Sequence, residues 1–223
     1  MLNDKLKQWF GFDTFKDGQE EIIQSVIDGH HTLGILPTGS GKSLCYQLPT
    51  YILEKPTLVI SPLISLMDDQ VMQMKLNGEN HVTYVHSGMD EVEKNNNIKR
   101  IPHSRFIYLS PEYLLQSQNF KLISNIDFGL IVLDEAHCLS EWGYDFRPHY
   151  ALVGKVIDHY RNATALALTA TAPPHLEEDL SDILNVKLNV IKKSMNRDNI
   201  NLQHMNFSDD NEKIDWLIPF LTY

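Results

Sequence analysis

Cysteine is scarce in this sequence, and the two residues present are poorly placed for a cross-link or a zinc site. Cys45 and Cys138 are the only cysteines among the 223 residues, and they stand far apart. No Cys-x-x-Cys pair occurs, and the ten histidines lack the spacing typical of zinc ligands. We therefore expect neither a structural zinc site nor a disulfide framework.

Positive charge and long apolar runs are also lacking. The formal net charge is -10, whereas a stand-alone nucleic-acid-binding module is usually basic, so we expect weak DNA affinity from this chain alone. No run of 18 apolar residues occurs, and the first ten residues (MLNDKLKQWF) do not resemble a signal peptide. These absences predict a soluble protein of the cytoplasm, nucleoid-associated if bacterial, with no membrane partner; we expect a monomer.

Short β-branched runs alternate with segments of helical spacing. This alternation predicts an α/β fold, with a parallel β-sheet flanked by helices, in which ligands bind beyond the carboxyl ends of the strands. Strands are expected at Thr32–Leu36, Thr57–Ile60, Val82–Val85, Phe106–Leu109, Leu130–Leu133 and Ala165–Leu168, with one more apolar run at Leu188–Ile191. Helices are expected at Gln19–Ile27, Ser43–Leu53, Ile64–Leu76, Tyr150–Tyr160 and Pro174–Leu184, and Glu91–Arg100 is expected to be a polar surface segment.

A glycine-rich segment lies between the first of these strands and a helix, which is the context of a phosphate-binding loop. Its glycines would let backbone N–H groups turn toward phosphate oxygens at a helix N-terminus. Lys42 would reach the β- and γ-phosphates, and the Ser43 hydroxyl would ligate Mg²⁺. The segment comprises Pro37, Thr38, Gly39, Ser40, Gly41, Lys42 and Ser43.

Two adjacent carboxylates follow the apolar strand Leu130–Leu133. Asp134 would hold Mg²⁺, and Glu135 would orient or deprotonate the attacking water. Together with the phosphate-binding loop, the pair predicts hydrolysis of a nucleoside triphosphate. We therefore assign Lys42, Asp134 and Glu135 as candidate catalytic residues, and a nucleoside triphosphate with Mg²⁺ as the candidate ligands.

The order of the motifs resembles that of the superfamily 2 helicases: PTGSGKS at 37 to 43, DEAH at 134 to 137 and ALTATA at 167 to 172. Two further segments resemble the RecQ family of DNA helicases. They are FGFDTFKDGQEEII (10 to 23), like the adenine-recognition segment, and CLSEWGYDFRPHY (138 to 150), like the aromatic-rich loop. The resemblance implies a RecA-like P-loop NTPase domain of an ATP-dependent 3′-to-5′ DNA helicase.

The adenine-recognition resemblance implies that Gln19 hydrogen-bonds the adenine edge while Phe12 and Lys16 flank the ring. A Gln amide carries both a donor and an acceptor, and an aromatic or cationic side chain can stack on a base. Family members usually have Tyr, Arg and Pro where this sequence has Phe12, Lys16 and Asp17. Since Lys lacks the planar guanidinium, stacking on the base is expected to be weaker here.

The resemblance also implies DNA-binding or coupling roles for Trp142, Phe146 and Arg147, whose aromatic rings could stack on bases of single-stranded DNA. It gives similar roles to His137, Thr169 and Thr171, between the nucleotide site and the DNA. The segments Ser61–Leu63 and Ser110–Glu112 resemble strand-contact motifs. Single-stranded and partly duplex DNA are the expected partners.

We expect residues 1–193 to form a RecA-like ATP-binding domain, and residues 194–223 to form the hinge and the start of a truncated second motor domain. The segment MNRDNI (195 to 200) resembles the family's hinge. In such helicases an Arg of the second domain stabilises the transferred phosphoryl group. We therefore expect this chain alone to bind Mg-ATP with little hydrolysis and no unwinding.

Two alternative functions stay open at this point. One is a non-catalytic binding protein, against which intact Lys42, Ser43, Asp134 and Glu135 argue. The other is an RNA helicase of the DEAD-box relatives, against which His137 and the loop from Trp142 to Tyr150 argue.

Overall fold

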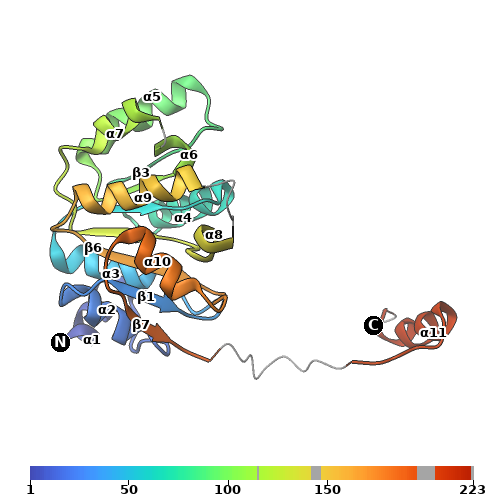
Figure 1. The fold of residues 1–223 in the computed structure, drawn as a ribbon. Coiled ribbons are helices and arrows are strands. Elements are labelled where there is room, and N and C mark those ends of the chain that lie inside the picture. Colours follow the sequence, from blue (N-terminus) through green and yellow to red (C-terminus); the bar gives the residue numbers. More distant parts are fainter. Residues whose placement is uncertain (115, 142–146, 195–203, 222–223) are drawn as a thin grey trace.

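A central parallel sheet organises the molecule, which we describe from a computed structural model. The structure describes residues 1–114, 116–141, 147–194 and 204–221. The sheet has seven strands in the order β3-β4-β2-β5-β6-β1-β7 (Figure 1). The strands are β1 (Thr32–Ile35), β2 (Thr57–Ile60), β3 (Val82–Val85), β4 (Phe106–Leu109), β5 (Leu130–Leu133), β6 (Thr164–Thr169) and β7 (Asn189–Lys192).

Helices form layers on the two faces of the sheet. One face is covered mainly by α2 (Gln19–Ile27), α3 (Leu44–Leu53) and α4 (Ile64–Leu76), with α1 (Leu2–Phe10) packed outside α2 and α3. The helices of the other layer are α5 (Glu91–Arg100), the 3-10 turn η1 (Ile101–His103), α6 (Pro111–Leu114), α7 (Ser117–Ile123), α8 (His137–Glu141), α9 (Arg147–His159) and α10 (Leu176–Leu184). A further helix, α11 (Asp210–Leu221), follows residues 195–203.

The alternation of side chains along each buried strand explains why the sheet has a core on both faces. In β5, Leu130 and Val132 pack on the α3 side, whereas Ile131 and Leu133 pack on the α9 side. A glycine permits close packing here, because a Cβ at Gly34 of β1 would lie 2.6 Å from the terminal side-chain carbon of Ile22. The missing side chain lets α2 approach the sheet closely.

The predicted strands are confirmed, and the apolar run Leu188–Ile191 forms β7 at one edge of the sheet. The five predicted helices are also present, although α9 begins at Arg147, before the predicted start at Tyr150. The sequence analysis did not predict α1, α6, α7 or α8. Within the described ranges, no helix is both long and apolar enough to cross a membrane.

One element prediction was wrong. The segment Glu91–Arg100, expected to be a polar surface segment between elements, is itself an element, helix α5. The Asp90 carboxylate caps it by accepting hydrogen bonds from the backbone N–H groups of Val92 and Glu93, both at 2.9 Å. Asn97 is buried, and its amide donates to the Tyr84 carbonyl at 3.0 Å. The asparagine run therefore includes a packing contact with β3, which the polar composition did not reveal.

Candidate functional site

The motif residues gather at one edge of the sheet because all seven strands are parallel. Backbone hydrogen bonds continue past the ends of the strands. The Leu36 N–H donates to the Thr169 carbonyl at 3.0 Å, and the Ala136 N–H donates to the Leu168 carbonyl at 2.9 Å. Since β6 lies between β1 and β5, the TAT motif of residues 169 to 171 separates the phosphate-binding loop from the DEAH segment.

The loop after β1 has the backbone expected of a phosphate-binding loop. Gly39 and Gly41 have φ angles of +79° and +75°, in the left-handed region that favours glycine. A Cβ at Gly41 would also lie 2.9 Å from the Gln19 amide nitrogen. Helix α3 begins directly after Ser43, so its N-terminal backbone N–H groups lie at the loop.

A triphosphate fits the groups that this loop presents. The Ser40 hydroxyl oxygen is buried and has no hydrogen-bond partner among the described residues. Lys42 contributes a cation beside the N-terminus of α3, and both favour an anionic ligand. The combination of a positive charge, a helix N-terminus and an unsatisfied buried hydroxyl suits phosphate oxygens better than an apolar ligand.

The carboxylate pair meets the loop lysine. The Lys42 ammonium nitrogen lies 3.7 Å from Glu135 Oε1, and both side chains are mostly buried. Glu135 has a φ of +50°, one of three non-glycine residues with positive φ among the described residues, and such strain is often found at functional sites. The structure therefore brings together two of the three predicted catalytic residues, Lys42 from the loop after β1 and Glu135 from just beyond β5.

Asp134 is buried beside this pair, and 7% of its surface is exposed. Burial is the main cause that raises the pKa of Asp134 to about 6; the charge of Glu135 raises it further, and Lys42 opposes the shift. A buried carboxylate with a raised pKa gains stability when a cation neutralises it. The buried Asp134 is thus suited to a cation such as Mg²⁺, whose preferred ligands are oxygen atoms.

Gln19 lies against the phosphate-binding loop. Only 3% of its surface is exposed. Its amide nitrogen donates to the carbonyl oxygens of Ser40 at 2.8 Å and Gly41 at 3.1 Å, and its amide oxygen accepts from the Lys16 N–H at 2.8 Å. Both N–H bonds are therefore used inside the protein. Sequence reasoning missed these contacts, because spacing carries no signal for a bond between segments about 20 residues apart.

A cavity of about 600 Å³ opens beside Gln19. Phe12 and Lys16 lie at its rim; Phe12 is 56% exposed, and the Lys16 ammonium donates to the Gly39 carbonyl at 2.9 Å. The three residues predicted to surround the adenine thus line one cavity next to the loop. An exposed aromatic ring and an available cavity are what base stacking requires.

The coupling candidates of the DEAH and TAT motifs contact one another. His137 Nδ1 lies 3.0 Å from the Thr169 hydroxyl and 3.4 Å from Glu135 Oε2. The Thr169 hydroxyl also donates to the Thr171 carbonyl at 2.9 Å. The Thr171 N–H also donates to the Thr169 hydroxyl, at 3.1 Å. This chain of contacts connects β6 to Glu135.

The structure describes only part of the segment predicted to contact DNA. Trp142 and Phe146 lie outside the described residues. Arg147 is the first residue of α9, and its side chain is also outside the description. Their roles stay predictions.

Comparison with known proteins matches residues 16–179 to the DEAD/DEAH box helicase family. The chain is 43% identical to a probable ATP-dependent DNA helicase RecS of Bacillus subtilis, over 99% of this chain and 45% of that protein. It is 41% identical to the ATP-dependent DNA helicase RecQ of Haemophilus influenzae, over 82% of this chain and 30% of that protein. The chain thus spans less than half the length of these curated relatives.

Solved structures share the fold. A hypothetical ATP-dependent RNA helicase from Sulfolobus tokodaii aligns with a TM-score of 0.68 and 23% identity, over 86% of this chain and 57% of that one. The DUF1998 helicase MrfA bound to DNA aligns with a TM-score of 0.66 and 17% identity, over 86% of this chain and 29% of that one. At these identities the likeness concerns the fold alone.

Proposed function

The chain belongs to the DEAD/DEAH box helicase family, and we propose that it is the ATP-binding motor domain of a RecQ-type, ATP-dependent 3′-to-5′ DNA helicase. The observation that carries this proposal is the meeting of Lys42, from the loop after β1, with Glu135, from the end of β5. The names of the DNA-helicase relatives support DNA over RNA as the nucleic acid.

We assign the nucleotide contacts as follows. Thr38 to Lys42 surround the phosphates with backbone N–H groups and one ammonium group, while Phe12, Lys16 and Gln19 bind the base. Ser43 and Asp134 would hold Mg²⁺, which when bound neutralises charge on the phosphates. Glu135 orients the attacking water and accepts its proton. His137, Thr169 and Thr171 relay changes at Glu135 to the end of β6.

The proposed division of the chain is a motor domain at 1–193 and, at 194–223, a hinge with the start of a second motor domain. Translocation and unwinding belong in this proposal to the two-domain motor, whose second domain supplies an Arg to the phosphoryl group. Trp142, Phe146 and Arg147 are the proposed contacts with single-stranded DNA. We propose a monomer that acts in the cytoplasm, at the nucleoid in a bacterium.

The test is Mg²⁺-dependent binding of a fluorescent ATP analogue to the wild-type chain, Lys42→Ala and Lys55→Ala. Lys55 is the matched control, because it pairs with Asp127 at 2.8 Å on the surface and lies before β2. Binding that is lost in Lys42→Ala and kept in Lys55→Ala supports the proposal. Equal weak binding by all three proteins would instead favour a non-catalytic module.

The second measurement is ATP turnover with oligo-dT, with oligo-U and without nucleic acid. The proposal expects slow turnover by this chain, with any stimulation larger for oligo-dT. Rapid DNA-stimulated turnover would show that the Arg of a second domain is dispensable, and a preference for oligo-U would favour the RNA-helicase alternative.

A further inference from the structure

Helix α1 ends directly before Phe12, one of the proposed base contacts. Gly11 caps this helix, and its N–H donates to the Lys7 carbonyl at 3.0 Å. Phe12 follows the cap and is exposed at the rim of the cavity beside Gln19. The place of the Phe12 ring at this rim therefore depends on how the last turn of α1 is held.

Two aromatic residues of that last turn pack on Tyr51 of α3. The ring centroids of Trp9 and Tyr51 are 5.4 Å apart, with their planes tilted by 34°. The Phe10 ring lies 5.9 Å from the Tyr51 ring in an edge contact. The Lys5 ammonium, one turn earlier in α1, lies over the Trp9 ring at 5.6 Å. Since such contacts favour particular ring orientations, they hold the end of α1 on one tyrosine ring.

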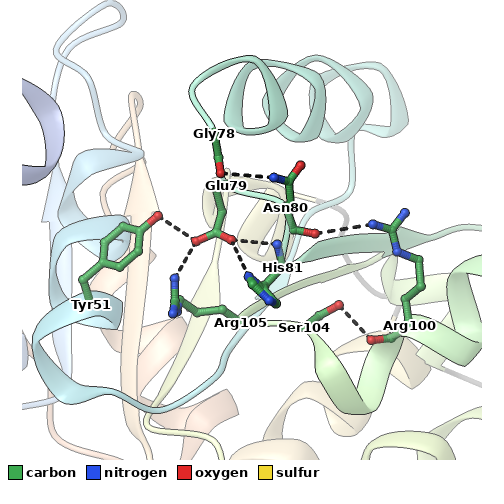
Figure 2. Close-up of polar contacts among 8 residues, drawn as sticks. All are labelled: Tyr51, Gly78, Glu79, Asn80, His81, Arg100, Ser104 and Arg105. Carbon is green, nitrogen blue, oxygen red and sulfur yellow. Dashed lines mark hydrogen bonds and ion pairs between the residues drawn. The ribbon is translucent and has the colours of Figure 1, made fainter.

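Tyr51 is itself fixed by a charged pair. Its hydroxyl donates to Glu79 at 2.8 Å, and the Arg105 guanidinium lies over its ring, 5.0 Å from the centroid (Figure 2). Arg105 also donates to Glu79 at 2.7 Å, and the same carboxylate accepts from the His81 N–H at 2.7 Å. The ring and the hydroxyl of Tyr51 are thus both engaged by groups of the protein. We call Tyr51, Glu79 and Arg105 the tyrosine support.

The charged pair of the tyrosine support lies at the edge of the sheet opposite to the phosphates. Arg105 directly precedes β4, and Glu79 lies between α4 and β3, so both are at the amino ends of the strands. The phosphate-binding loop follows β1 and is at the carboxyl ends. The contacts that run from Arg105 through Tyr51 to Trp9 therefore reach α1 without including a residue of the phosphate-binding loop.

We propose that Tyr51, fixed by Glu79 and Arg105, is a positioning residue for the nucleotide base, because it holds the last turn of α1 and so places the Phe12 ring. This inference rests on the proposed ATP site and adds residues that do not touch the phosphates. Loss of the tyrosine support should therefore weaken binding of the nucleoside part of ATP and leave binding of the phosphates unchanged. We define the nucleoside contribution as the Kd of tripolyphosphate divided by the Kd of ATP.

Isothermal titration calorimetry in Mg²⁺ measures both Kd values for the wild type, Phe12→Ala, Tyr51→Leu and Tyr51→Phe. Phe12→Ala should lower the nucleoside contribution about fivefold or more, which is the lower end for one stacked base. Tyr51→Leu loses the ring contacts and should lower it about three- to fivefold. Tyr51→Phe keeps the ring and should lower it no more than about twofold. The Kd of tripolyphosphate should stay unchanged in all three variants.

The two substitutions should not add, because Tyr51 acts on the base through Phe12. The double variant Phe12→Ala/Tyr51→Leu should have the nucleoside contribution of Phe12→Ala alone. Full additivity of the two effects would show that Tyr51 does not act through Phe12.

The matched control is Tyr160→Leu, on the other face of the sheet. Tyr160 also makes an aromatic contact, with Phe128 at 5.1 Å, and its hydroxyl donates to the Ile123 carbonyl. This variant therefore loses the same kinds of interaction as Tyr51→Leu, but in the cluster that packs on α9. It should lower the free energy of unfolding and leave both Kd values unchanged.

Arg105→Leu breaks the tyrosine support at a second point and should have the same effect as Tyr51→Leu. Two disrupting positions ensure that one failure to fold does not end the test, and circular dichroism shows which variants are folded. Leu6 should keep α1 attached in both variants, because it is buried in a separate cluster with Ile23, Leu44 and Leu48.

The outcomes separate this inference from the proposed function. An unchanged nucleoside contribution in folded Tyr51→Leu and Arg105→Leu, beside a lowered one in Phe12→Ala, would overturn this inference alone. An equal rise of both Kd values in Tyr51→Leu would also overturn it, because the role of Tyr51 would then be structural. If the wild type bound ATP no more tightly than tripolyphosphate, the proposed base site would be wrong, and this inference with it.

Discussion

The side-chain amide of Gln19 donates a hydrogen bond to the carbonyl oxygen of Ser40 at 2.8 Å, inside the phosphate-binding loop. The residue expected to read the base is therefore also bonded to the segment expected to hold the phosphates. Since both of its N–H bonds go to the loop, any adenine contact through them would require release of a loop carbonyl. Base binding and loop conformation are thus connected through one side chain.

This connection predicts that Gln19→Leu weakens binding of tripolyphosphate, a ligand with no base, as well as binding of ATP. The variant loses the hydrogen bonds that join Gln19 to Ser40, Gly41 and Lys16, so the loop must be ordered when the ligand binds. If this ordering costs about 1.4 kcal/mol, the scale of one such bond, both Kd values rise about tenfold. Isothermal titration calorimetry measures both. Gln24→Leu, whose side chain bonds only the exposed Asp28, is the control. Unchanged tripolyphosphate affinity would mean that Gln19 acts on the base alone.

A second prediction concerns the stability cost of the buried Asp134. Its pKa is raised from 3.8 to about 6, so the folded state binds a proton more readily than the unfolded state does. Ionisation therefore penalises folding, by up to about 3 kcal/mol above pH 6, and the penalty disappears near pH 4. Without Mg²⁺ or nucleotide, Asp134→Asn should raise the free energy of unfolding at pH 7 and change it little at pH 4.

Urea denaturation at the two pH values measures this effect, with Asp182→Asn as an exposed control. Asp134→Asn should gain unfolding free energy at pH 7 and lose Mg²⁺-dependent nucleotide binding. This combination is expected when a functional residue lowers the stability of the protein. A destabilised Asp134→Asn at pH 7 would contradict the prediction.

A third prediction concerns Glu79, whose ionisation should stabilise the fold, whereas ionisation of Asp134 destabilises it. Burial is the largest influence and raises its pKa, but the His81 N–H, the Tyr51 hydroxyl and Arg105 together lower the pKa below its ordinary 4.5. The folded state thus favours the ionised form, and this stabilisation is present above pH 4.5 and lost as pH falls through the lowered pKa. Glu79→Gln should cost about 1 to 3 kcal/mol at pH 7.

The measurement is urea denaturation of the wild type and Glu79→Gln from pH 7 to pH 3. The difference in unfolding free energy should shrink as the wild-type carboxyl becomes protonated. Glu91→Gln, an exposed acid of α5, serves as the control. A difference independent of pH would show that the shape of the side chain matters more than its charge.

A fourth prediction concerns the contact between α9 and α10. A Cβ at Gly154 of α9 would lie 2.4 Å from the backbone carbonyl oxygen of Ile183, so Ala cannot be accommodated without moving a helix. Ala favours a helix by about 1 kcal/mol over Gly, but the cost of the steric clash should be larger. We expect Gly154→Ala to lower the free energy of unfolding by about 1 to 3 kcal/mol in total. Thermal denaturation measures this. Gly88→Ala, where an added Cβ has no neighbour closer than 3.4 Å, should be nearly neutral.

The sequence by itself determined the strands and predicted the residues of the nucleotide site. The inner strands are short runs buried on both faces, so their composition is nearly continuous in apolar residues. Asp134 and Glu135 directly follow β5, and Lys42 lies in the loop between β1 and α3. Parallel strands bring their carboxyl ends to one edge, so adjacency in the chain was enough to place these side chains together.

Only the tertiary structure decided which polar side chains away from the strand ends would meet. The bonds of Gln19 to Ser40, of Glu79 to Tyr51 and of Asn97 to Tyr84 join separate segments, and amide or carboxyl groups of this kind form no periodic pattern. The cavity beside Gln19 has the same origin. Its lining comes from several helices and from the loops before α2 and after β1, so its shape is a property of the folded chain and of no single segment.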